Sequence, residues 1–91
     1  MASPSLHIRI LSPQQLLLDT EAFSLSSKNT QGNFDILPQH ANFLTVIEKS
    51  PIVVRIPKKP PLTFKFDVAI IFAANNQVSV YTYIQPQIDK K

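Results

Sequence analysis

The stretch Ile52-Val53-Val54-Arg55-Ile56-Pro57-Lys58-Lys59-Pro60-Pro61-Leu62-Thr63-Phe64-Lys65-Phe66 decides the fold of this chain. On each side of its prolines, apolar and polar residues alternate, and a period of two is typical of a half-buried β-strand. Proline cannot donate a hydrogen bond to a central ladder, so Pro57 to Pro61 is expected to end one strand and lead into the next. The stretch predicts a β-hairpin with Lys58 and Lys59 at its tip.

The same alternation appears near both ends of the chain. Leu6 to Ile10 follows it, and so does Val78 to Thr82. Asn75 and Asn76 tolerate positive φ, so they predict a tight turn from which the last strand, Gln77 to Ile84, pairs back as a hairpin. These patterns predict strands, each separated from the next by turn residues.

Two segments are ambiguous. Ala41 to Ile47 has apolar residues at helical spacing, but the preceding Pro38 and the β-branched end of the segment favour a strand. Val68 to Phe72 is apolar at both parities. Such a strand is either buried on both faces or covered on one face by a partner, and the residues alone do not separate these alternatives.

Length and composition define the class. The 91 residues are 44% hydrophobic and 16% charged, which is enough apolar material for one core and too little chain for two. No segment predicts a helix of ten or more residues, and the longest apolar runs are about seven residues, far short of a membrane-spanning helix. We predict one all-β domain, an antiparallel β-sandwich or flattened barrel of about 8–10 short strands.

The residues offer little for catalysis. The chain has no cysteine and one glycine, Gly32, which argues against thiolate chemistry and glycine-rich phosphate loops. Its six carboxylates are scattered, and His7 lies on the polar parity of its strand, as a surface histidine would. We therefore expect no enzyme activity, no cofactor and no metal site.

The charge leaves one alternative function open. The formal net charge is +3, and a freestanding β-sandwich or barrel module could bind an anionic partner through Lys58, Lys59 and Lys65. Tyr81 and Tyr83 share one side of the last predicted strand, but few cations accompany them. That combination is weak support for a nucleic-acid surface, so nucleic acid is not expected as a partner.

A family resemblance lies in the central segment, Thr30-Gln31-Gly32-Asn33-Phe34-Asp35-Ile36-Leu37-Pro38-Gln39-His40-Ala41-Asn42-Phe43-Leu44-Thr45. It resembles the signature of the amino-terminal domain of F-type ATP synthase epsilon subunits, called delta in mitochondria. That signature has a glycine-bearing turn, then Ile-Leu-Pro, one residue, His-Ala and an apolar-Thr run. Leu6 to Pro13 is similar to the family's first strand and turn, and the resemblance covers residues 5 to 85. Independently of the family, Phe34, Ile36 and Leu37 are expected to anchor the chain after Gly32 in a core.

The resemblance implies a non-catalytic rotor subunit with two partners. It implies that the subunit joins the gamma subunit of the central stalk to the membrane c-ring and couples proton- or sodium-driven rotation to ATP synthesis. By position, the resemblance places Gln31, Asn33 and His40 toward the c-ring loops. It places toward gamma the residues Phe43, Leu44, Ile70 and Ile71. It implies no homo-oligomer, and membrane contact only through the complex.

The chain also departs from the family pattern. Val68 and Ala69 stand where a Gly-Gly pair is usual, Asn33 where an acidic residue is frequent, and Asp35 where glycine is common. The helical hairpin that follows this domain in typical epsilon chains is not expected here, and with it autoinhibition and ATP binding. We expect a tail at 1–5, the domain at 6–85 and a polar tail at 86–91. The expected location is peripheral, on the cytoplasmic face of a bacterial inner membrane, or the matrix or stromal side in an organelle.

Overall fold

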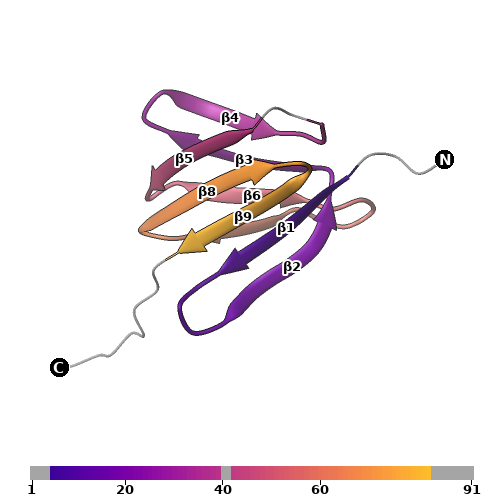
Figure 1. The fold of residues 1–91 in the computed structure, drawn as a ribbon, viewed down its shortest axis with the longest axis horizontal. Helices are drawn as coiled ribbons and strands as arrows, with labels where there is room; N and C mark the ends of the chain where they lie inside the picture. Colours follow the sequence, from indigo (N-terminus) through magenta and orange to yellow (C-terminus); the bar gives the residue numbers. More distant parts are fainter. Residues whose placement is uncertain (1–4, 40–41, 83–91) are drawn as a thin grey trace.

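A computed structural model describes residues 5–39 and 42–82, which form nine strands in two sheets (Figure 1). The first sheet has the order β2-β1-β9-β8-β5. Its strands are β1 (Leu6–Leu11), β2 (Leu16–Ala22), β5 (Phe43–Glu48), β8 (Val68–Ala74) and β9 (Gln77–Thr82). The second sheet has the order β4-β3-β6-β7. Its strands are β3 (Ser24–Asn29), β4 (Gly32–Ile36), β6 (Pro51–Arg55) and β7 (Leu62–Lys65).

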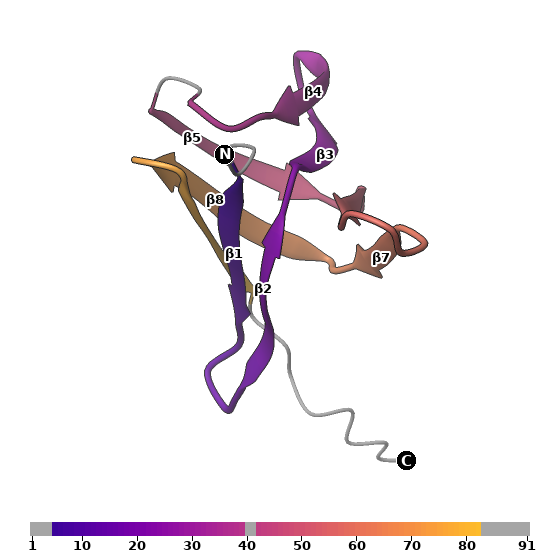
Figure 2. The ribbon, with the colours of Figure 1, turned by 90° about the vertical axis from the view of Figure 1, so that its right-hand side faces the viewer.

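All strand pairs are antiparallel except β1 and β9, which run parallel in the middle of the five-stranded sheet. The chain passes from the first sheet to the second at Phe23, whose backbone N–H donates to the carbonyl of Arg55 at 2.9 Å. Figure 2 shows the β1–β2 hairpin extending away from the other strands. The predicted all-β sandwich class is confirmed.

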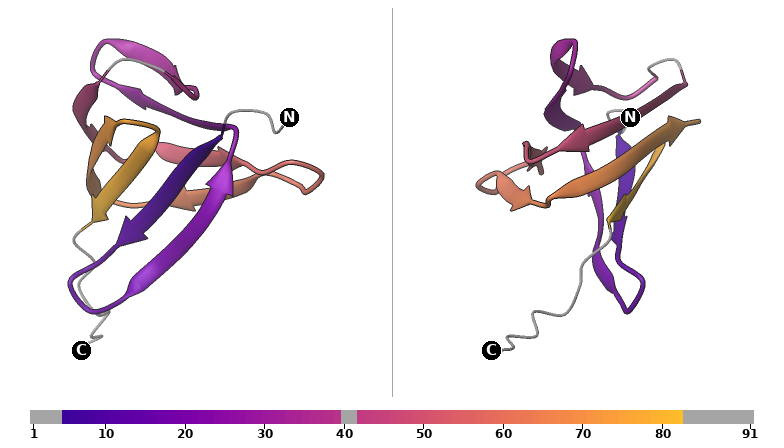
Figure 3. Two further views of the ribbon diagram at one scale, coloured as in Figure 1. Left: turned by 45° about the vertical axis from the view of Figure 1, so that its right-hand side comes forward. Right: turned by 90° about the vertical axis from the view of Figure 1, so that its left-hand side faces the viewer.

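One core lies between the two sheets, which Figure 3 shows from two further sides. Both sheets contribute buried residues to it because every second side chain of a strand points to the same face. The fully or nearly fully buried residues are Leu6, Ile8, Ile10, Ala22, Leu25, Ile36, Ile47, Ile52, Val54, Ala69, Ile71, Ala73, Val78 and Val80. Most are β-branched aliphatics, which pack well on a pleated surface.

Both predicted hairpin turns are present. The segment 57–61 joins β6 to β7, with Lys58 at φ 63°, and the pairing runs from Pro51↔Lys65 to Val54↔Leu62. Asn75 and Asn76 have φ of 54° and 63° and join β8 to β9. The strand predicted over Ala41 to Ile47 is found as β5, from residue 43 onward.

Some expectations need correction. The sequence did not predict β2 or β4 as strands. In β2, the pairing with β1 shifts register between Ile10 and Leu11, which leaves Leu17 without a direct partner and breaks the period of two. Leu37 was expected in the core, but its side chain is 50% exposed, because β4 ends at Ile36 and Ile36 takes the inward position.

Strand β8 has apolar residues on both of its faces. Ala69, Ile71 and Ala73 point into the core, whereas Val68, Ile70 and Phe72 are exposed on the outer face. Of the two alternatives, burial of this strand on both faces is wrong for the described chain. Ile70 and Phe72 form part of the surface described next.

Candidate functional site

An apolar surface lies on the outer face of the five-stranded sheet, over strands β5, β8 and β9. Antiparallel pairing places Leu44 opposite Phe72, Val46 opposite Ile70, and Ile70 opposite Tyr81. Opposed residues share a face, so these five side chains are neighbours across three strands. Their exposed fractions run from 43% for Ile70 to 66% for Leu44. We call Leu44, Val46, Ile70, Phe72 and Tyr81 the apolar face.

The local sequence explains why these residues point outward. Thr45 and Ile47 of β5 alternate with Leu44 and Val46, and the inward position of Ile47 is fixed by burial in the core. The Thr45 hydroxyl accepts a hydrogen bond at 3.0 Å from the side-chain amide of Asn29 on β3 of the other sheet. Thr45 and Ile47 therefore point into the sandwich, and the alternate residues Leu44 and Val46 point to solvent.

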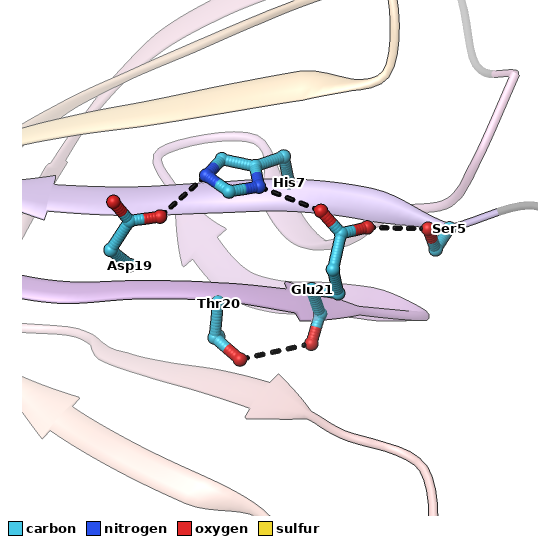
Figure 4. A network of polar contacts seen from close by, with 5 residues as sticks. All are labelled: Ser5, His7, Asp19, Thr20 and Glu21. Atoms are coloured by element: carbon cyan, nitrogen blue, oxygen red, sulfur yellow. Dashed lines mark hydrogen bonds and ion pairs between the residues drawn. The ribbon is translucent and has the colours of Figure 1, made fainter.

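On β1 and β2, the same outer face is charged. The imidazole of His7 on β1 lies between two carboxylates of β2 (Figure 4). Its Nε2 is 2.5 Å from Asp19 Oδ1 and its Nδ1 is 2.7 Å from Glu21 Oε2. The Ser5 hydroxyl donates to the second oxygen of Glu21 at 2.6 Å. Because both ring nitrogens face acceptors, this geometry favours the imidazolium, in which both nitrogens donate.

The charge cluster shifts two pKa values in opposite directions. The hydrogen bond with Glu21 is the main cause that raises the pKa of His7 above 6.5. Desolvation opposes this rise, and the hydrogen bond with Asp19 adds to it. Hydrogen bonds from Ser5 and then from His7 lower the pKa of Glu21 below 4.5. The prediction of His7 as a surface histidine is correct, but the carboxylates that flank it were not foreseen. Their i, i+2 spacing places both carboxylates on one face of β2, but only the pairing of β1 with β2 brings that face to His7.

The residues predicted for the c-ring side belong to the β3–β4 hairpin. Gln31 lies in its turn, where its backbone N–H donates to the Asn29 side-chain oxygen at 2.8 Å, and Asn33 is exposed on β4. Gly32 has φ of 122°, a conformation that side-chain-bearing residues rarely adopt. His40 lies outside the described residues. Gln31 and Asn33 are therefore on the sheet opposite the one that carries the apolar face.

The residues predicted for the gamma side divide into three kinds. Leu44 and Ile70 belong to the apolar face. Phe43 is half-buried and packs on Phe34 with ring centroids 5.1 Å apart. Ile71 has no exposed side chain and is part of the core. Sequence reasoning missed the face residues Val46, Phe72 and Tyr81 as a group, although alternate positions from Leu44 and Ile70 lead to the first two.

The lysines of the alternative function are not gathered. Lys58 and Lys59 are in the β6–β7 turn, whereas Lys65 is at the end of β7 far from that turn. In residues 5–39 and 42–82, no three histidine or carboxylate side chains are placed to hold a metal ion. No helix in this same part of the chain has the length and apolar character needed to cross a membrane.

Comparison with known proteins points to one family. The family model of the ATP synthase delta/epsilon chain β-sandwich domain matches residues 5–83. The chain is similar to ATP synthase epsilon chain 2 of Paraburkholderia xenovorans (strain LB400), with 43% identity over 54 residues. That match covers 58% of this chain and only 37% of the relative, so the chain aligns with well under half of that relative.

Two solved structures share the fold. A chain of the Euglena gracilis mitochondrial ATP synthase, solved with OSCP, F1 and the c-ring, superposes with a TM-score of 0.81 at 8% identity. The match covers 88% of this chain and 51% of that one. A chain of the Tetrahymena thermophila central stalk and c-ring gives a TM-score of 0.73 at 14% identity, covering 87% and 63%. With the sandwich, the signature segment and the family match in agreement, the chain belongs to the ATP synthase delta/epsilon family, of which it has the β-sandwich domain.

Proposed function

We propose that this chain is a non-catalytic subunit of the rotor of an F-type ATP synthase. It joins the gamma subunit to the c-ring, so that rotation driven by protons or sodium ions reaches catalytic sites on other subunits. Residues 6–85 act as the working domain, with short tails at 1–5 and 86–91. Its place is peripheral, on the side of the membrane where the stalk lies, and it touches the membrane only through the complex.

One observation carries the proposal: the apolar face. Its five large side chains are all at least 43% exposed and are adjacent across three strands. Contiguous exposed apolar patches mark interaction sites more often than free surface, since each side chain left in water loses its burial energy. Gamma is the partner that family membership favours for this face. Phe43 packs on Phe34 and Ile71 is buried in the core, so these two residues hold strands β5 and β8 rather than face the partner.

The second contact is assigned to the β3–β4 hairpin. Gln31 and Asn33 present uncharged amides there, at a turn that the Asn29 side chain and Gly32 hold in one conformation. His40 joins this set by its place in the signature segment. Amides suit polar loops whose contacts do not depend on charge, so we assign this hairpin to the c-ring loops.

The proposal is tested by titrating the chain with the gamma subunit encoded in the same genome, at low and at high salt. We expect a one-to-one complex whose Kd changes little with salt, because salt screens charges and leaves apolar contacts in place. Leu44→Lys should weaken the complex at least about tenfold, because it leaves a charge in an apolar contact. The matched control is Leu62→Lys on β7, an exposed leucine outside the apolar face.

Two results would overturn the proposal. The first is a folded chain that does not bind gamma at either salt concentration. The second is equal weakening by the two lysine variants. Binding to polyanions that falls steeply with salt would favour the alternative function through Lys58, Lys59 and Lys65.

A further inference from the structure

The two sheets have four edge strands, and one of them is unprotected. Those edges are β2, β5, β4 and β7. An edge strand carries a row of backbone N–H and C=O groups without a strand partner, which makes it a template for pairing with another chain. Proteins commonly protect such edges with bulges, charges, prolines or short strands. The described part of the chain protects three of its four edges in these ways.

The protection differs from edge to edge. Strand β2 contains the register shift opposite Ile10 and Leu11 and bears Asp19 and Glu21. Strand β7 has only four residues, follows two prolines and ends in Lys65. Strand β4 has five residues, begins at Gly32 and carries Asp35.

Strand β5 has six residues and none of these features before its last residue. Its sequence from Phe43 to Glu48 contains no proline, glycine or lysine, and its single charge is at the last residue. Its six pairs with β8 run in register without a bulge. Among the described residues, the one hydrogen bond from outside the ladder to its backbone is from the Ser50 hydroxyl to the Glu48 carbonyl, at 3.2 Å. Its free side is therefore regular enough to accept another strand.

Space is present beside this edge. A cleft of about 580 Å³ lies there, lined by Lys28, Asn29, Thr30, Thr45, Val46, Glu48 and Ser50. Its walls come from the end of the β3–β4 hairpin on one side and from β5 on the other. The lining is mainly polar, whereas the outward side of β5 carries Leu44 and Val46 of the apolar face.

We propose that β5 is the site at which the partner protein adds an extended strand to the five-stranded sheet. This inference rests on the proposed function and specifies how gamma is held: by a backbone ladder along β5 that continues the apolar contact. In the added segment, apolar and polar residues must alternate. Its residues beside Leu44 and Val46 are apolar, and those facing the cleft are polar, because successive side chains of a strand point to opposite faces.

Amide hydrogen exchange of the isotope-labelled chain, free and saturated with gamma, tests the inference. In an antiparallel edge strand, the amides that point to the neighbour and those that point to the free side alternate. In the free chain, the alternate amides of β5 that face the free edge exchange fast. In the complex they should slow by at least about tenfold, as newly hydrogen-bonded amides do. Free-edge amides of β7 serve as the internal control and should not change.

A proline variant gives a second test. Proline replaces whichever of Thr45 and Val46 has the fast-exchanging amide, which removes a donor from the free edge and leaves the ladder with β8 intact. We expect at least about a tenfold loss of affinity for gamma, whereas alanine at the same position, which keeps the N–H, should lose clearly less. The exchange experiment on the unaltered chain decides the matter if the proline variant does not fold.

The possible outcomes separate the two claims. Binding to gamma with slowed free-edge amides of β5 supports both. Binding to gamma while these amides exchange as fast as in the free chain overturns strand addition and leaves the stalk role standing. Absence of any complex overturns the stalk role, and strand addition by gamma with it.

Discussion

At the scale of single residues, two neighbouring isoleucines differ in role: one stabilises the core and the other lies on the surface. Ile71 is fully buried and Ile70 is 43% exposed on the same strand. Ile71→Ala should lower the free energy of unfolding by about 2–5 kcal/mol, because it removes buried methyl groups and leaves a cavity. Ile70→Ala should cost no more than about 1 kcal/mol. Urea unfolding of the two variants, followed by circular dichroism, measures both values.

The same pair should reverse its order in binding. In the absence of urea, where both variants are folded, Ile70→Ala should weaken the complex with gamma more than Ile71→Ala does. Because each variant is the control for the other, a similar stability loss from both would contradict the assigned parity of β8. Ile71 would then not be the residue that anchors the strand.

His7 makes the stability of the β1–β2 pair depend on pH. Its raised pKa contributes stability that is fully present below 6.5, the ordinary value, and is lost as pH rises through the higher folded-state value. The lowered pKa of Glu21 contributes stability present above 4.5 and lost as pH falls through the folded-state value. The unfolding free energy of the chain should therefore exceed that of His7→Gln most between these two values.

The measurement is the difference in urea midpoint between the chain and His7→Gln, at about pH 5.5 and about pH 9. We expect the difference to shrink at the higher pH, where the imidazole is neutral and one nitrogen no longer donates. A gap that is constant across this range would mean that the charge cluster does not hold the imidazolium.

At the scale of elements, the β3–β4 hairpin depends on one backbone conformation. Gly32 has φ of 122°, and a Cβ there would meet nothing within 4 Å, so any penalty comes from the backbone alone. Gly32→Ala should lower the unfolding free energy by about 1–3 kcal/mol. Thermal and urea unfolding measure it. Asn33→Ala, one residue along on the exposed side, is the control and should stay within about 0.5 kcal/mol. Equal effects from both would remove the special role of Gly32.

The elements also show which parts of the fold could be predicted from sequence. Strands β1, β6, β7 and β9 alternate strictly enough to be predicted. The turn at 57–61 is marked by its prolines, and the turn at 75–76 has asparagines suited to positive φ. Strand β2 was not predicted because Leu16-Leu17-Leu18 spans the register shift, where the alternation of apolar and polar residues fails. Strand β4 was not predicted because its outward residues, Asn33 and Asp35, are of types that are frequent in loops.

The candidate site was only half predictable for a related reason. Leu44 and Ile70 were identified through the family resemblance, but the residues of β8 could not be assigned to a face from their apolar character alone. Register with β5 and β9 makes that assignment, and register is set by the whole sheet. The flanking of His7 by Asp19 and Glu21 likewise needs the pairing of β1 with β2. Neither can be deduced from spacing within one strand.

At the scale of the whole molecule, one core serves both sheets. Ile8 of the first sheet and Ile52 of the second belong to the same cluster of buried residues. We expect a single cooperative unfolding transition, because neither sheet retains a core without the other. Methyl resonances of Ile8 and Ile52, followed by NMR through a urea titration, should give the same midpoint. Midpoints that differ beyond error would mean that the sheets unfold as separate units.

The central position of the parallel pair β1–β9 has a consequence for how the protein is made. Strand β9 lies between β1 and β8, so it alone connects the β1–β2 hairpin to the rest of its sheet. Of the nine strands it is also the last to leave the ribosome. During synthesis, β1 can pair with β2 early, but its other edge has no strand partner until β9 has been made. Until then, this open edge of β1 could pair with another chain, so the nascent protein is exposed to misassembly until its last described strand is in place.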